Sequence, residues 1–360
     1  MRKLALLLGS LLVVASASAK EVVPAPVVVE EAPVQVIEKE VIVYRDKEEG
    51  FRPNGNVDLQ YRWYGETEGQ KEVKGKNWNT SNNDSRIQLS GTVNMTEKQQ
   101  LQFRIREYNS TSAHDSTGRD GTDTRLRYFY NHGLLGDSKV NLTSRVHYRD
   151  REDVKGAQEV EYQARFDFAD YMFQNDFIKT SYFVIAPKYK YVWQSSNDDA
   201  YDNRLGFDIA SYYELPLGFT FELNFYADQH FYGAKSELLQ KDGSKEDKNF
   251  TVDMEAYIYN TTNLYTNGNV SLDFKFEGGY DPYSWSQEKE YSLTTNEESA
   301  DKTYSLYALP TIQVNYQATP NVVVYAAAGA EYRNWNSIDE GSASNWRWQP
   351  TVFAGFKTTF

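Results

Sequence analysis

The sequence contains no cysteine, although its first residues have the form of an export signal. Residues 1–19 combine two basic residues at positions 2 and 3, an apolar stretch from Leu4 to Val14, and small residues from Ala17 to Ala19 before a cleavage site. We therefore expect an exported chain that is stable without disulfides. This argues against small secreted scaffolds, which usually depend on disulfides, and favours a fold with many backbone hydrogen bonds.

Long apolar runs are also missing after residue 19, so the sequence offers no stretch of about 18 apolar residues for a transmembrane helix. The mean hydropathy is −0.68 and 25% of the residues are charged, yet 15% are aromatic. Aromatic residues interleaved with polar ones are typical of closed β-barrels that cross a membrane. Such barrels pair every backbone group internally while alternating apolar and polar side chains.

Basic residues are outnumbered, with 38 Lys and Arg against 51 Asp and Glu. Removing Arg2 and Lys3 with the signal takes the formal charge from −13 to −15, a loss of two positive charges. An acidic mature chain argues against a nucleic-acid partner.

Residues for catalysis and metal binding are scarce, since the chain has four histidines and no Walker-type glycine motif. Ser144 and His147 lie three residues apart on one expected strand, which puts them on opposite faces. The acidic stretch "SSNDDAYDN" lacks the 12-residue calcium-loop pattern. We expect no catalytic residue, cofactor or metal site, and hence a protein that is not an enzyme.

From Asn54 onwards the apolar residues alternate with polar ones. The stretch "NVDLQYRWY" places Val57, Leu59 and Tyr61 on one face and Asp58 on the other, as expected for a strand with one apolar and one wet face. We count 14 such stretches, beginning near residues 54, 85, 101, 124, 139, 159, 178, 203, 219, 250, 270, 304, 322 and 351. The prediction is an all-β fold, a single transmembrane antiparallel barrel of about 14 strands over residues 54–360.

Residues 20–53 differ from the barrel sequence in being rich in Val, Glu and Pro. Three prolines favour an extended beginning. From Val34 to Tyr44 the apolar residues fall at three- and four-residue spacings, which allows a short amphipathic helix. A charged periplasmic linker is the alternative, and both interpretations stay open.

The connections between the expected strands alternate in length. Short links such as "MTEKQ", "HGLLGD", "ELPLG" and "QATPN", and the somewhat longer "NTTNLYTNGN", alternate with mostly longer polar links such as "NSTSAHDSTGRDGTD". Short periplasmic turns and long outward loops are typical of outer-membrane barrels. The sequence therefore predicts a bacterial outer-membrane location, with both barrel ends on the short-turn side.

The polar faces of the expected strands carry charges that separate by sign. Basic residues expected to line the lumen are Arg62, Arg86, Arg104, Arg106, Arg125, Arg127, Arg145, Arg149 and Arg165. Acidic residues expected to line it are Asp208, Glu222, Asp228, Asp253, Glu255, Asp273 and Glu277. So many charges in a dry core would be costly, so we expect a water-filled lumen crossed by a transverse field. The alternative is ordinary salt bridging between neighbouring strands.

The last ten residues, "TVFAGFKTTF", carry Val352, Phe356 and Phe360 on one face. A terminal strand of this form resembles the signal by which the assembly machinery recognises outer-membrane proteins, and the resemblance implies that role for these three residues. The outer faces of the last two strands also carry small residues, and these form a candidate subunit contact, with a smooth lipid-facing patch as the alternative. They are Ala326, Ala328, Ala330 and Ala354.

The Val/Glu/Pro segment "VVVEEAPVQVIEKEVIVYRDKEEGFRPNG", the first strand "GNVDLQYRWYGE" and the terminal "FKTTF" resemble the fusobacterial major outer-membrane porins of the FomA type. The resemblance covers the whole length. It implies a trimeric, voltage-sensitive porin for small hydrophilic solutes and ions, with exposed loops that serve in adhesion to other cells.

The sequence thus predicts passive diffusion through a charged lumen, with outer-membrane lipid, small hydrophilic solutes, the assembly machinery and two further copies of the chain as partners. The alternative is a surface adhesin whose barrel displays loops. A soluble carbohydrate-binding sandwich is a third interpretation, disfavoured by the alternating loop lengths.

Overall fold

The computed structural model describes residues 50–68, 84–110, 121–152, 156–194, 197–233, 235–294, 296–299, 301, 306–335 and 345–360. The expected signal peptide and nearly all of the segment 20–53 lie outside these residues, as does His114. Within the described ranges, no helix has the length and apolar character needed to cross a membrane.

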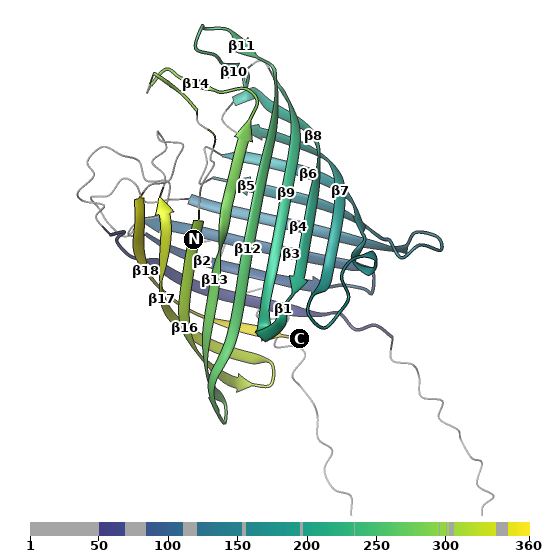
Figure 1. Ribbon diagram of the computed structural model, residues 1–360, viewed down its shortest axis with the longest axis vertical. Helices are drawn as coiled ribbons and strands as arrows, with labels where there is room; N and C mark the ends of the chain where they lie inside the picture. Colours follow the sequence, from purple (N-terminus) through teal and green to yellow (C-terminus); the bar gives the residue numbers. More distant parts are fainter. Residues whose placement is uncertain are drawn as a thin grey trace, which may run out of the picture. The chain divides into compact units, whose positions relative to one another are not determined.

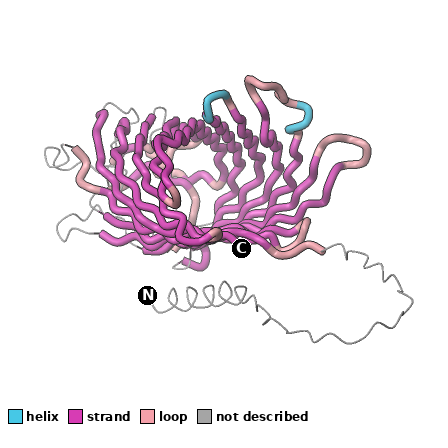
Figure 2. Tube along the Cα trace, turned by 90° about the horizontal axis from the view of Figure 1, so that it is seen from below, coloured by secondary structure: helices cyan, strands magenta, loops and turns pink. Residues whose placement is uncertain are grey.

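The described residues form a closed barrel of 14 antiparallel strands (Figures 1 and 2), as the alternation predicted. Seen from below in Figure 2, the strands follow one another around a ring. Each strand pairs with its neighbours in chain order. The barrel strands are β1 (Asn54–Tyr64), β2 (Asp84–Asn94), β3 (Gln99–Ser110), β4 (Gly121–Leu134), β5 (Asn141–Arg151), β6 (Ala157–Asp167), β7 (Lys179–Gln194), β8 (Asn197–Glu214), β9 (Phe219–Tyr232), β12 (Lys248–Asn267), β13 (Val270–Ser286), β16 (Leu306–Thr319), β17 (Val322–Trp335) and β18 (Asn345–Thr359).

The last strand closes the barrel against the first. β18 runs antiparallel to β1, with Val57 opposite Thr358 and Tyr64 opposite Thr351. This pairing answers the edge-strand problem of an open sheet, because the backbone groups of both terminal strands find partners. The expectation that the C-terminal strand is tied to the N-terminal one is confirmed.

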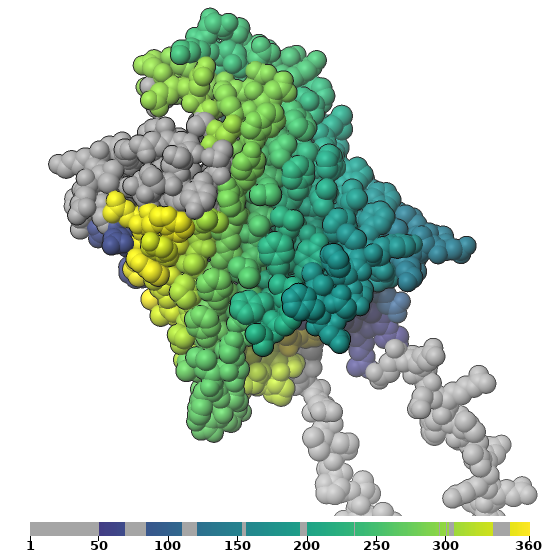
Figure 3. All heavy atoms as spheres, viewed as in Figure 1, coloured from purple at the N-terminus to yellow at the C-terminus, as the bar shows by residue number. Residues whose placement is uncertain are grey.

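The β12–β13 hairpin is longer than the sequence indicated. The stretch "NTTNLYTNGN" was expected to be a connection, but β12 continues to Asn267 and β13 starts at Val270, with register shifts within the pair. Threonine and tyrosine suit strands even where no apolar alternation marks them, so backbone pairing extends through this polar segment. The hairpin reaches beyond its neighbours at the lower end in Figures 1 and 3.

Two of the long connections contain small hairpins that the alternation did not predict. β10 (Leu238–Leu239) pairs with β11 (Lys245–Glu246), and β14 (Tyr291–Ser292) pairs with β15 (Glu297–Glu298). Gly243 turns the first hairpin at φ 86°, which suits glycine after aspartate in a tight turn. Strands of two residues are too short to show a hydrophobic period.

The two faces of the barrel wall differ in chemistry, as the period of two requires. On the outer face Tyr61, Val146 and Val352 are 48%, 45% and 47% exposed. On the opposite face Glu161 and Gln163 are buried. Figure 3 shows the outer surface over β8 to β13 as a continuous wall. A wall with apolar side chains outside and buried polar groups inside is the reverse of a soluble globular fold.

Candidate functional site

The polar face of the wall is the interior of the barrel. A cavity of about 480 Å³ is lined by Arg62 on β1, Tyr259 on β12, Glu277 on β13 and Tyr325 on β17. These strands belong to one arc of six consecutive strands, β1-β18-β17-β16-β13-β12, so the cavity lies along the inner face of that arc.

The strand register places all the charged residues expected to line the lumen on this inner face. Arg104 is opposite Arg125, which is opposite Arg149 on the next strand. Asp208 is opposite Tyr226, which in turn is opposite Asp253. Side chains directly opposite in a ladder share a face, so the parity assigned from the sequence continues from strand to strand.

The inner face of β1 to β6 carries the expected arginines, and we call it the basic side. It contains a carboxylate that the sequence analysis overlooked. Asp123 on β4 accepts hydrogen bonds from Arg149 at 2.8 and 2.9 Å and from Arg104 at 3.1 Å, and its side chain is 1% exposed. Arg145 is paired with Glu161 at 2.5 Å. These three arginines are therefore compensated within the wall. Asp123 lies near the start of β4, next to a polar loop. There the alternation of apolar and polar residues does not yet show which face a side chain occupies.

Arg125 and Arg127 have a different environment. Among the described residues, neither lies within 4 Å of a carboxylate, and the Arg127 Nε is buried without a hydrogen-bond partner in the protein. Neutral groups hold the other arginines of this side. Arg62 donates to Thr351 at 2.9 Å, Arg86 lies over the Tyr64 ring at 5.8 Å, Arg106 donates to Gln88 at 2.7 Å, and Arg165 donates to Gln163 at 2.7 Å.

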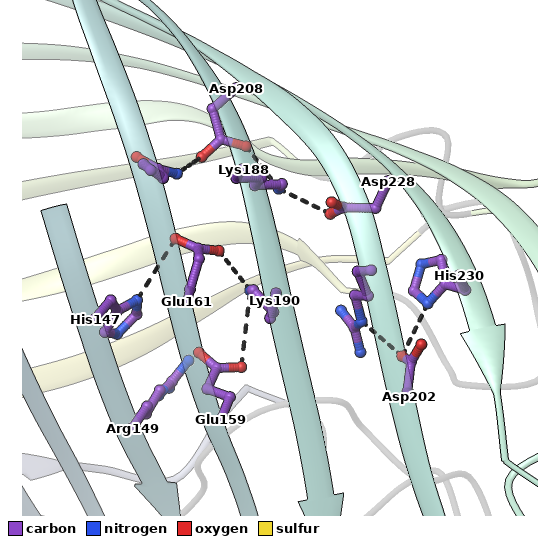
Figure 4. Close-up of polar contacts among 12 residues, drawn as sticks. His147, Arg149, Glu159, Glu161, Lys188, Lys190, Asp202, Asp208, Asp228 and His230 are labelled. Carbon is purple, nitrogen blue, oxygen red and sulfur yellow. Dashed lines mark hydrogen bonds and ion pairs between the residues drawn. The ribbon is translucent and has the colours of Figure 1, made fainter. Parts of the chain in front are cut away.

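Two lysines on β7 join the basic and acidic sides (Figure 4), and the sequence analysis did not single them out. The Lys188 Nζ lies 2.6 Å from Asp208 and 2.9 Å from Asp228, with its side chain 2% exposed. Lys190 lies 3.2 Å from Glu161. Their strand, "IKTSYFVIAPKYKY", is apolar on both faces for several residues, which made its parity ambiguous. The alternation of lysine with tyrosine at 188–191 is the signal that identifies the inner face.

Two histidines complete the network in Figure 4. The His147 Nδ1 lies 3.9 Å from Glu161, and the His230 Nδ1 lies 2.9 Å from Asp202, which also accepts from Arg204 at 2.6 Å. Both imidazoles are buried on the inner face. They act here as partners of buried carboxylates.

The inner face of β8, β9, β12 and β13 carries the expected carboxylates, and we call it the acidic side. Some of these carboxylates have a basic partner and others do not. Asp208 and Asp228 share Lys188, so the three groups together carry one negative charge rather than two. The others accept from neutral donors: Glu222 from Tyr259 at 3.3 Å, Asp253 from Ser284 at 2.5 Å, Glu255 from Tyr226 at 3.1 Å, Asp273 from Asn315 at 2.6 Å, and Glu277 from Tyr307 at 2.7 Å. The unpaired acidic charge therefore lies on β9, β12 and β13.

Charges of opposite sign face each other across the ring. In the strand order, β4 and β13 are seven steps apart in either direction, so they are opposite members of the 14-strand ring. Arg125 and Arg127 belong to β4, while Asp273 and Glu277 belong to β13. Two arginines without a carboxylate partner thus lie on the strand opposite two carboxylates without a basic partner, while salt bridges hold Arg104, Arg145 and Arg149.

Ser144 and His147 lie on opposite faces, as their spacing predicted. Ser144 is opposite Tyr130, whereas His147 is opposite Arg127. Ser144 Oγ instead contacts His132 Nε2 at 2.9 Å and Tyr162 at 3.0 Å. In the part of the chain that the structure describes, no cluster of three or more His, Cys, Asp or Glu side chains is placed to hold a metal ion.

The terminal strand presents Val352 and Phe356 outward, whereas Phe353 lies on the inner face opposite Arg62. Val352 and Phe360 are 47% and 42% exposed, and Phe356 is half-buried. On the same face Ala328 lies opposite Val352, and Ala326 lies opposite Ala354, so the small residues do form one patch on β17 and β18.

No protein-family model matches the sequence, and no curated protein does. Solved structures are similar at low identity. The trimer form of OmpT, an outer membrane protein of Vibrio cholerae, has a TM-score of 0.34 and 9% identity, covering 86% of this chain and 98% of that one. An anion-selective porin from Comamonas acidovorans has a TM-score of 0.31 and 8% identity, covering 86% and 99%. Salmonella typhi OmpF in complex with daunomycin has a TM-score of 0.33 and 13% identity, covering 86% and 97%. These values do not justify a transfer of function, which has to be argued from the residues themselves.

Proposed function

We propose that the protein is a porin of the bacterial outer membrane, which lets small hydrophilic solutes and ions diffuse passively through a water-filled, charge-segregated lumen. The single observation that carries the proposal is the closed barrel with an apolar outer face and uncompensated charges of opposite sign on its inner walls. An apolar exterior suits contact with lipid. A closed barrel also leaves no backbone group without a hydrogen-bond partner inside the bilayer.

Water in the lumen is supported by the interior chemistry. Buried polar atoms such as Arg127 Nε, Asp228 Oδ1 and His147 Nε2 make no hydrogen bond to the protein. A buried polar atom that makes no hydrogen bond is costly in a dry interior, so these atoms favour a hydrated interior.

The selectivity of such a channel would come from the two opposed walls. Arg104, Arg106, Arg125, Arg127 and Arg145 form the basic side of the proposed narrow zone, with the inward carboxylates across from them. In this arrangement the field runs across the lumen and acts on the charge and dipole of each passing solute. No reaction and no cofactor is part of the proposed function.

The outer face of the last two strands supports two proposals on assembly. We place Val352, Phe356 and Phe360 in the assembly signal, because a terminal strand with an exposed apolar face is open to recognition by another protein before it closes the barrel. The small-residue patch around Ala328 is the proposed contact between subunits of a homotrimer, since small side chains allow two flat surfaces to approach closely.

The test is a recording of single channels of the purified protein in planar bilayers under a salt gradient. Replacing Arg125 by Glu, alone and together with Arg104→Glu, should move the reversal potential toward cation preference. Arg125 is the sharper position because it has no carboxylate partner in the described chain, so its replacement leaves no ion pair broken.

Lys179→Glu is the matched control. It makes the same charge change at an exposed site, where the side chain is 59% accessible at the end of β7. The proposal fails if the purified barrel passes no current. It also fails in its charge-selective part if Arg125→Glu and Lys179→Glu shift the reversal potential equally. A silent barrel whose loop deletions abolish cell attachment would favour the adhesin.

A further inference from the structure

Tyrosines and glutamates alternate on the inner face of β9, β12, β13 and β16, and we call this surface the tyrosine–carboxylate wall. Tyr259 donates to Glu222 at 3.3 Å and lies opposite Glu277. Tyr257 lies opposite Glu222. The wall consists of Tyr226, Tyr257, Tyr259 and Tyr307 with Glu222, Glu255 and Glu277.

The rings of the wall are grouped rather than scattered. Tyr257 and Tyr259 have centroids 6.1 Å apart at 31°, and Tyr257 meets Tyr307 edge to face at 6.4 Å. Together they form one aromatic surface on which the carboxylates are interspersed.

The carboxylates of the wall have no basic partner among the described residues. In the described chain, no lysine or arginine lies within 4 Å of Glu222, Glu255 or Glu277, whereas Asp208 and Asp228 nearby are bound by Lys188. A phenol donates a hydrogen bond without cancelling the negative charge. The wall therefore combines electron-rich ring faces with three negative groups, which is the chemistry that binds alkylammonium and guanidinium ions.

The barrel uses the same chemistry for its own cations at both ends of the wall. The Arg333 guanidinium lies 4.6 Å from the centroid of the Tyr307 ring and 3.8 Å from Asp281. The Lys188 ammonium lies 5.7 Å from the centroid of the Tyr226 ring, between two aspartates. In each case one ring and nearby carboxylates hold a side-chain cation.

We propose that the tyrosine–carboxylate wall is a binding subsite for organic cations, in particular solutes with alkylammonium groups. The inference rests on the proposed function in one respect, namely that solutes reach the lumen. Aromatic rings favour an organic cation over a metal ion, because a hard divalent metal requires converging oxygen ligands.

The probe is hexane-1,6-diamine, with hexane-1,6-diol as the uncharged control of equal length and Mg²⁺ as the inorganic divalent control. Binding to the detergent-solubilised barrel is measured by titration calorimetry, and block of the potassium chloride current is measured in bilayers. We expect the diamine to bind, the diol not to bind, and Mg²⁺ to bind at least tenfold more weakly than the diamine.

Two sets of variants separate charge from aromatic contact. The triple variant Glu222→Gln, Glu255→Gln, Glu277→Gln should weaken diamine binding at least tenfold, while Asp273→Asn, an inward carboxylate bound by asparagines, should change it less than twofold. Tyr257→Leu should weaken it roughly threefold to thirtyfold, the range of a cation–π contact. Tyr257→Phe, which keeps the ring but loses the hydrogen bond to Asp281, should stay within about twofold of the wild type. Heat-modifiable gel mobility verifies that every variant is a folded barrel.

The outcomes distinguish the two proposals. If the barrel carries no current yet binds the diamine through the wall, the porin function fails and the subsite stands. If it conducts but the triple variant binds the diamine as well as Asp273→Asn does, the subsite is refuted. Equal binding of diamine and Mg²⁺ would also refute it, because the rings would then contribute nothing.

Discussion

Replacing Lys188 by methionine should destabilise the barrel strongly. The Lys188 ammonium lies 2.6 Å from Asp208 and 2.9 Å from Asp228, and its side chain is 2% exposed. Methionine fills a similar volume without the charge. The substitution therefore leaves two buried carboxylates facing each other with no cation between them.

The expected magnitude follows from the burial of the three groups. Removing one partner of a buried ion pair costs about 3–5 kcal/mol in unfolding free energy, because the remaining charge is stranded. Here two carboxylates lose the same partner, so the upper half of that range applies. Gln163 still donates to Asp208, which offsets part of the loss at that carboxylate.

The measurement is reversible urea unfolding of the barrel in phospholipid vesicles, followed by tryptophan fluorescence. Lys179→Met is the matched control: its ion pair with Glu214 spans 3.4 Å between side chains 59% and 49% exposed, and its loss should leave the urea midpoint close to that of the wild type because solvent screens an exposed pair. The triple variant Lys188→Met, Asp208→Asn, Asp228→Asn should recover most of the stability, since no charge is then left unpaired. The reasoning is refuted if Lys188→Met and Lys179→Met unfold at the same urea concentration, or if the triple variant is less stable than Lys188→Met.

Two further perturbations test the outer patch and the packing of the inner face. Ala328→Trp should reduce the oligomer band on unheated gels while the heat-modifiable monomer persists, because the bulky ring separates the proposed subunit faces; unchanged migration would count against the trimer contact. Gly355→Val should lower the unfolding free energy by about 1–3 kcal/mol, because a Cβ at this position would come within 2.7 Å of the Tyr325 hydroxyl and 2.3 Å of the Leu59 carbonyl oxygen. Equal stability of Gly355→Val and the wild type in urea would show that the hydroxyl moves aside freely.

The architecture was accessible from the sequence because a period of two determines which side chains share a face. In a barrel strand that is apolar outside and polar inside, every side chain indicates which face is which. The number of strands and the inner position of Arg104 and Glu222 therefore followed from the alternation of odd and even positions alone. The closure of β18 on β1 followed from the even strand number. What parity does not contain is depth along the strand and the choice of partner across it.

The errors of the sequence analysis arose because alternation gives neither the depth of a residue along its strand nor its partner on the next strand. Asp123 lies at the beginning of its strand, and the alternation gave no sign that it accepts from both Arg104 and Arg149 on neighbouring strands. Lys188 lies on a strand with a doubly apolar segment, where parity is ambiguous. Asp208 and Asp228 were correctly placed inside, but the lysine that they share cancels one of their two negative charges.

Lys188 reaches Asp228 because the strand between them carries a glycine. Lys188 on β7 is opposite Gly206 on β8, which is opposite Asp228 on β9, so the ion pair passes over a residue without a side chain. A Cβ at Gly206 would lie 2.4 Å from the Asp228 carboxylate. Two other glycines occupy the same kind of position: Gly279 lies between Tyr257 and Tyr307, whose rings meet edge to face, and Gly355 lies between Gln60 and Tyr325, which are joined by a hydrogen bond of 3.2 Å.

Of these three positions only Gly206 lets opposite charges combine, because the cross-strand neighbours of Gly279 and Gly355 are uncharged. At Gly206 on β8, an inward lysine of β7 meets an inward aspartate of β9. The missing side chain on β8 lets Lys188 and Asp228 form an ion pair. Arg125 on β4 and Glu222 on β9 have no partner of opposite sign within 4 Å in the described chain. In the proposed channel, such unpaired residues would set the transverse field. An inward glycine placed between an inward lysine and an inward aspartate of its two neighbouring strands therefore indicates where opposite charges can pair.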